Sequence, residues 1–210
     1  RQWTQQLGTS SEDVGYGVAV VSNNIYVTGA THGNLSGSTN GSSDIFLEKY
    51  SSAGARLWTQ QLGTSSEDVG YGVAGDSTSP VANIYVTGYT KGNLGTPNNA
   101  GNSDIFLAKY YDNSTYQSTI LLGSSSAEVG RSVAVNSSNN VYLTGDNMSD
   151  DGDFDSFITK YNSSGIQQWA AEISSDNTTS SYADYGYGVV VNSDGYIYAV
   201  GNTGGELDNN

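Results

Sequence analysis

The sequence predicts an all-β protein, a β-propeller of four-stranded antiparallel blades, with about 3.5 to 4 blades present. The segment WTQQLGTSSEDVGYGVA occurs without a change at residues 3–19 and again at 58–74. The tyrosine of an Ile-Tyr-Val-Thr-Gly element recurs at Tyr26, Tyr85, Tyr142 and Tyr198. The resulting period of roughly 57 residues is in the range of propeller blades. No segment of useful length has the hydrophobic period of a helix.

The first repeat contains the strand pattern in its clearest form. Arg1–Leu7 alternates apolar and polar residues and is predicted to be the outer strand of a preceding blade. Gly17–Val21 and Ile25–Gly29 flank a Ser-Asn-Asn turn, as in a β-hairpin. A second hairpin is predicted from Asp44–Tyr50 and Arg56–Leu62.

The later repeats follow the same plan with more substitutions. The predicted strands are Val73–Asp76, Asn83–Gly88, Asp104–Tyr110 and Tyr116–Leu122, then Ser132–Asn136, Asn140–Gly145, Asp155–Tyr161 and Ile166–Ile173, then Gly188–Asn192 and Tyr196–Gly201. We therefore divide the single propeller domain, residues 1–210, into an outer strand at 1–14 and units at 15–63, 70–123, 130–173 and 186–210.

The fourth unit has no third strand of the Asp-Ile-Phe-Leu type. A ring built from this set of strands would keep an open sheet edge, and open edges pair readily with other chains. We expect these residues to be a partial propeller from a longer chain. The alternative is closure between two copies of the chain, or other self-association through the open edge.

Charge and composition exclude several classes of partner. The net charge of −14 disfavours nucleic acid and anionic membranes, which require clustered cations. The absence of cysteine excludes disulfides, Cys-ligated zinc and thiol nucleophiles. No apolar run is long enough for membrane insertion. Cations, neutral glycans and basic proteins remain as partners.

The second repeat resembles a known family. Its spaced elements are Trp58 to Gly63, Asp68 to Ala74, Ile84 to Gly88 and Gly101 to Tyr110, and together they resemble the bacterial β-propeller repeat called SBBP. The later copies depart from the pattern: Tyr116 stands near the Trp position, Arg131-Ser132 replaces Tyr-Gly, and Val200 replaces Thr. The resemblance implies a propeller in an exported or cell-surface bacterial protein, a setting in which such repeats often have no assigned activity.

The acidic pairs do not predict catalysis. Glu12-Asp13 recurs as Glu67-Asp68 and partly as Glu128 and Asp184. A glycosidase needs two carboxylates that face each other across the scissile bond, whereas adjacent residues usually point apart. Their recurrence predicts one structural role in every blade. Since His32 is the only histidine and no nucleophile motif is present, we predict that the protein is not an enzyme.

Two further polar positions recur in the third strand. Asp44, Asp104 and Asp155 are predicted to accept backbone N–H groups of the preceding turn. Lys49, Lys109 and Lys160, five residues further on, are predicted to be solvated charges.

Calcium is the one cofactor that the sequence suggests. The stretch DNMSDDGDFD gathers five acids around a glycine, and calcium binds six to eight oxygens from a flexible loop. The candidate ligands are Asp146, Asp150, Asp151, Asp153 and Asp155. The stretch does not have EF-hand spacing, so a solvated acidic loop is the alternative.

The segments that vary most between repeats are three loops: His32–Ser43, Lys91–Ser103 and Asp146–Asp153. Because they occupy equivalent blade positions, we expect them on one face, where rigid scaffolds usually bind partners. The candidate partner-binding residues are His32, Asn34, Lys91, Asn93 and Asn147. We expect a non-enzymatic scaffold that binds protein or glycan. The alternative is a lectin or carbohydrate-active enzyme that uses the acids and aromatics of this face.

Overall fold

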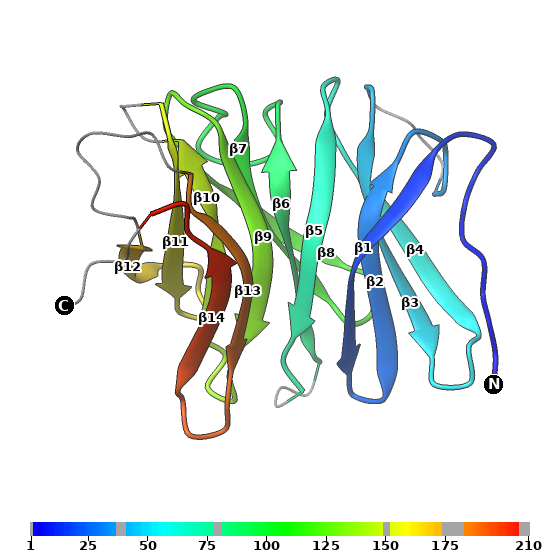
Figure 1. Ribbon diagram of the computed structural model, residues 1–210. Helices are drawn as coiled ribbons and strands as arrows, with labels where there is room; N and C mark the ends of the chain where they lie inside the picture. Colours follow the sequence, from blue (N-terminus) through cyan, green and yellow to red (C-terminus); the bar gives the residue numbers. More distant parts are fainter. Residues whose placement is uncertain (1, 37–40, 78–80, 149–151, 174–182, 206–210) are drawn as a thin grey trace.

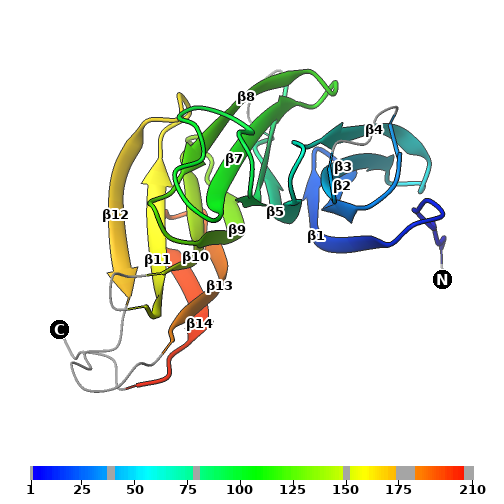
Figure 2. The same ribbon diagram turned by 90° about the horizontal axis from the view of Figure 1, so that it is seen from above.

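The computed structural model describes residues 2–36, 41–77, 81–148, 152–173 and 183–205. They form three four-stranded antiparallel sheets and one two-stranded sheet, which confirms the predicted all-β propeller and gives three and a half of the predicted 3.5 to 4 blades. Figure 1 shows the sheets side by side, and Figure 2 shows them as an open arc with β1, β5, β9 and β13 on the inner side. These described residues include no helix, and so none that could cross a membrane.

Within each blade the strands follow one another from the inside outward. Blade 1 consists of β1 (Asp13–Val21), β2 (Asn24–Thr31), β3 (Asp44–Ser51) and β4 (Arg56–Leu62). Blade 2 consists of β5 (Asp68–Gly75), β6 (Asn83–Thr90), β7 (Asp104–Tyr111) and β8 (Tyr116–Leu122). Blade 3 consists of β9 (Glu128–Val135), β10 (Val141–Met148), β11 (Phe154–Tyr161) and β12 (Gln167–Ile173), and the half-blade consists of β13 (Tyr185–Val191) and β14 (Ile197–Asn202).

Each inner strand begins earlier than the sequence predicted, because its Gly-rich start is a β-bulge and not a connector. The register shifts between Gly15 and Gly17, and equivalent shifts occur in β5, β9 and β13. A bulge adds one residue and redirects its side chain. The bulged residues are Tyr16, Tyr71, Arg131 and Tyr187. Tyr16 and Tyr71 meet edge to face with ring centroids 4.8 Å apart.

Adjacent blades fit together through a threonine and a glycine. The Thr28 hydroxyl donates to the carbonyl of Phe46 at 2.8 Å, which fixes its side chain against Gly70 of the next blade. A Cβ on Gly70 would lie 2.6 Å from the Thr28 Oγ1, so only glycine fits there. The same contact recurs between Thr87 and Gly130 and between Thr144 and Gly186. Aliphatic and aromatic side chains of the two sheets complete the core between each pair of blades.

The prediction that Lys49 is solvated is wrong. Lys49 is buried and forms an ion pair with Asp112 in the turn of the next blade. The hydroxyl of Tyr26 donates to the same carboxylate, and the indole of Trp58 donates to the Asp112 carbonyl at 3.0 Å. Lys109 similarly reaches the carbonyl of Ser163 at 3.2 Å. The lysines therefore join blades, a role that only contacts between repeats could reveal.

The predicted strand at Arg1–Leu7 is also wrong, since residues 2–12 contain no strand. A strand requires a hydrogen-bonded neighbour, and the described residues offer none on that side of blade 1. Trp3 still makes the contact expected of its repeat position. Its indole donates to the Ser52 carbonyl at 3.0 Å, as Trp58 does to Asp112.

Blade 3 replaces an aromatic pair by an ion pair. In blade 2 the rings of Tyr71 and Tyr89 lie 6.0 Å apart. In blade 3 the equivalent positions hold Arg131 and the fully buried Asp146, whose bidentate hydrogen bonds measure 2.7–3.0 Å. Burial raises the pKa of Asp146, although Arg131 opposes the shift.

Asp112→Asn is expected to lower the free energy of unfolding at pH 7 by about 1–3 kcal/mol, since charge-assisted hydrogen bonds are lost. Burial raises the pKa of Asp112, but the hydrogen bonds from Lys49 and Tyr26 outweigh it and hold that pKa below 3.8. The stabilisation is therefore present above pH 3.8 and is lost as the pH falls through the lowered folded-state pKa. Urea unfolding between pH 2 and 7 measures this, with Asp194→Asn as control. An equal effect at all pH values would contradict it.

Arg131→Leu is expected to destabilise the protein by about 3 kcal/mol, because it leaves the buried Asp146 carboxylate without its cation. The double variant Arg131→Tyr with Asp146→Tyr rebuilds the aromatic pair of blade 2 and is expected to recover most of that loss. Thermal and urea unfolding of both variants measure the difference. A double variant no more stable than Arg131→Leu would contradict the equivalence of the two pairs.

Candidate functional site

The predicted partner-binding residues lie at the loop-bearing end of the blades, at the top of Figure 1. His32, Asn34, Lys91 and Asn93 are exposed there, in the β2–β3 and β6–β7 loops. Asn147 is different: it belongs to β10, where it pairs with Glu128 and Asp155, and it is half-buried. The prediction of a loop position for Asn147 is therefore wrong, because β10 extends further than the Thr-Gly pattern indicated.

The predicted calcium ligands are not brought together by the described residues. Asp146 is engaged by Arg131, while Asp150 and Asp151 lie outside the described residues. Asp153 precedes β11 and Asp155 lies within it, and in the described ranges no group of three or more acids or histidines is placed to hold a metal ion. Calcium binding at this stretch stays a prediction.

The recurrent acids have the structural role that their repetition indicated. The Asp68 carboxylate accepts the backbone N–H of Thr64 at 2.6 Å and the hydroxyls of Thr64 and Thr90. Asp13 accepts the equivalent bonds in blade 1. Asp104 accepts the N–H of Ala100 at 3.0 Å, as predicted for the third-strand acids. These carboxylates hold the connections between strands.

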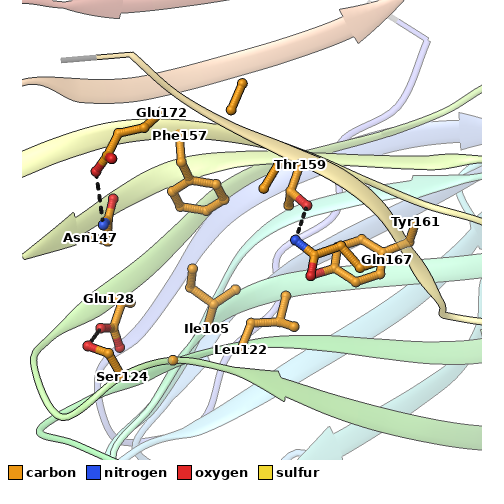
Figure 3. A pocket seen from close by; sticks show the side chains of 13 residues that line it. Ile105, Leu122, Ser124, Glu128, Asn147, Phe157, Thr159, Tyr161, Gln167 and Glu172 are labelled. Atoms are coloured by element: carbon orange, nitrogen blue, oxygen red, sulfur yellow. Dashed lines mark hydrogen bonds between the residues drawn. The ribbon is translucent and has the colours of Figure 1, made fainter.

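The most promising site is a cavity of about 500 Å³ between blades 2 and 3, shown in Figure 3. We call it the interblade groove. Its size is that of a small-molecule site. Ile105 and Leu122 of blade 2 form one wall, and Phe157 and Tyr161 of blade 3 form the other. These residues belong to the core between the two blades or pack against it, so the protein interior supplies the apolar walls.

The groove exists because β12 is lined by small and polar residues. Phe106 pairs with Leu121 in blade 2, whereas the equivalent Phe157 pairs with Glu172 in blade 3. In the same way, Ala170 and Ala171 occupy the positions of Thr119 and Ile120. Ser118, and not Tyr116 as predicted, occupies the position of Trp58. Ser118 pairs with Lys109 in blade 2 as Trp58 pairs with Lys49 in blade 1. This change leaves a further cavity of about 410 Å³ in the lower part of the same interface.

Polar groups line the upper part of the groove. The Glu128 carboxylate is buried; Ser124 donates a hydrogen bond to its Oε1, while its Oε2 has no partner among the described residues. Burial raises the pKa of Glu128. The side-chain amide of Asn147 donates to Glu172 at 3.4 Å, and within the described ranges no group bonds its own buried oxygen. Gln167 donates to Thr159 at 3.3 Å at the other end, as Figure 3 shows.

This arrangement suits a neutral ligand that has both an apolar face and hydroxyl groups. Aromatic and aliphatic walls favour the apolar face, and carboxylate and amide oxygens accept hydrogen bonds from hydroxyls. The described lining contains two carboxylates and no cation, which disfavours an anionic ligand. The sequence did not predict this site. Glu128 stands at the position of the structural acids and accepts from the Ser124 hydroxyl as Asp68 accepts from that of Thr64, and Glu172 belongs to no motif.

Glu128→Gln is expected to raise the melting temperature at pH 7. Because the folded-state pKa of Glu128 is raised above 4.5, ionising this carboxyl in the folded protein costs stability as the pH rises through that pKa. Glutamine removes the cost and keeps the oxygen that accepts from Ser124. The gain should vanish below pH 4.5, where the carboxyl is protonated in both states. Calorimetry from pH 3 to 8 checks this, with exposed Glu12→Gln as control; a gain that persists at pH 3 would contradict it.

Comparison with known proteins agrees with this architecture. The family model SBBP, described as a beta-propeller repeat, matches residues 2–36 and 57–95. No curated protein matches the chain significantly. The two matched segments include β1–β2 and β4–β6, which are elements of blades 1 and 2. Residues 2–36 and 57–95 thus match the SBBP beta-propeller repeat, in agreement with the propeller blades that the described residues form.

Proposed function

We propose that this propeller is a non-enzymatic binding module, and that its ligand is a neutral glycan held in the interblade groove. The observation that carries the proposal is the buried carboxylate oxygen of Glu128, unpartnered beside the apolar walls of a cavity of about 500 Å³. An unpaired buried acceptor is costly, and a ligand hydroxyl would satisfy it.

The sugar class follows from the combination of groups. A pyranose ring has an apolar face that stacks on aromatic rings and a rim of hydroxyls that bind carboxylates and amides. The partly buried Phe157 offers a ring, and the buried Tyr161 supports the wall beside it. Glu172 and Gln167 offer polar groups from the exposed outer strand. The chain's net charge of −14 further disfavours anionic polymers.

The exposed loops extend the proposed surface beyond the groove. Glu128 and Asn147 lie at the same end of the blades as the loops that carry His32 and Lys91. In this proposal the loops contact the parts of a glycan or glycoprotein that project from the groove. Following the family resemblance, we place the protein outside the bacterial cell or on its surface, where glycans are available.

A second candidate function is glycoside hydrolysis in the same groove. Glu128, whose raised pKa suits a general acid, and Glu172 both line the cavity, and Asn147 lies between them in Figure 3. Two carboxyl groups in one cleft are what such chemistry requires. A hydrolysed product from any oligosaccharide that binds would favour the enzyme over the binding module.

Binding is tested on an array of neutral gluco-, manno-, galacto- and xylo-oligosaccharides, followed by calorimetry on those retained. Gln167→Ala and Glu172→Gln are each expected to weaken binding about tenfold, the value of a ligand hydrogen bond. Gln168→Ala is the matched control, because Gln168 lies on the same strand outside the groove. An empty array, or binding unaffected by either groove variant, would refute the glycan site.

A further inference from the structure

The two outer faces of the arc are complementary. Every blade presents one face to the blade before it and another to the blade after it. Val18 on the first face of blade 1 is 69% exposed, whereas the equivalent Val73, Val133 and Val189 are 4–7% exposed. The second face of the half-blade is open in the same way. Tyr198 is 57% exposed there, against 0–3% for Tyr26, Tyr85 and Tyr142.

The complementarity extends to the threonine–glycine contact that joins the blades. Val200 occupies the position of Thr28, Thr87 and Thr144, and it is 65% exposed. Gly15 occupies the position of Gly70, Gly130 and Gly186. A Cβ on those three glycines would meet a threonine at 2.5–2.6 Å, but a Cβ on Gly15 would meet nothing closer than Val27 at 3.8 Å. Blade 1 thus has an open notch beside Gly15. The half-blade has the exposed side chain of Val200, which is branched at Cβ like the threonines that contact the other three glycines.

The open area on blade 1 also matches a two-stranded partner. On its outer part, Phe46 and Glu48 are already buried, and the Trp3 ring lies against Gly54 with its indole bonded to Ser52. Only the inner part, with Gly15, Val18 and Val20, is left uncovered. In the described residues the half-blade consists of β13 and β14, which correspond to the two inner strands of the other blades and so match this uncovered inner part.

We propose that this chain self-associates head to tail, with β13–β14 of one copy packed on β1–β2 of the next. The contact repeats the packing between blades: Val190, Tyr198 and Val200 of one copy cover Gly15, Val18 and Val20 of the other. Such a contact joins two different surfaces, and so it forms a closed ring or an open chain of copies. Because each copy carries a charge of −14, added salt strengthens the association.

Sedimentation equilibrium of the 210-residue chain, from micromolar to several hundred micromolar and at low and high salt, tests the proposal. The wild-type chain associates more strongly at high salt. Gly15→Leu fills the notch and Val200→Asp places a charge on the opposite face, so each variant alone is monomeric. An equimolar mixture of the two variants forms a 1:1 dimer, since each keeps one intact face. Ile166→Asp, a charge on an exposed apolar side chain away from both faces, associates like the wild type.

The alternatives give different results. If the free edge of β14 pairs with another strand, both variants associate as the wild type does and the mixture gains nothing. A wild-type chain that stays monomeric throughout, or a mixture that forms no dimer while circular dichroism shows both variants folded, overturns the proposal.

Discussion

The structure depends on how one sheet packs against the next. A threonine of the second strand, held by a hydrogen bond to the third, fills a space that only glycine leaves open on the following blade. Aliphatic and aromatic residues around this contact close the core, and no blade has a core of its own. As in other repeat folds, stability therefore resides in the interfaces between neighbours. A change in one interface alters the protein locally and leaves the rest of the arc in place.

The interface between blades 2 and 3 differs from the interface between blades 1 and 2 by such a local change. The first interface is filled by Trp58 and by the ion pair of Lys49 with Asp112. In the second, Ser118 replaces the tryptophan, and alanines with Glu172 line β12. The space that results carries an unpartnered carboxylate oxygen on Glu128. Side chains fill the interface between blades 1 and 2, whereas the interface between blades 2 and 3 contains a cavity lined by polar groups. We therefore propose that a ligand binds in this cavity.

The same logic links the groove to the open faces of the arc. Both are positions where the packing between blades is incomplete, but they differ in chemistry. The groove combines apolar walls with unsatisfied oxygens and suits a polar ligand. The outer faces carry valines, a tyrosine and an open glycine, and suit another blade of the same kind. One recurring interface thus accounts for the fold, the candidate site and the proposed assembly.

The sequence by itself determined the blades. Exact repeats, strand alternation and turn residues placed all fourteen strands of the described chain, because these signals are local and recur once per blade. The tertiary structure alone decided the contacts between repeats. It buried Lys49, left residues 2–7 without a strand partner in the described chain, placed Asn147 in β10, and brought Glu128 and Glu172 to one cavity. These residues meet because one sheet packs on the next, and the local signals of strands and turns carry no information about which side chains face each other across that interface.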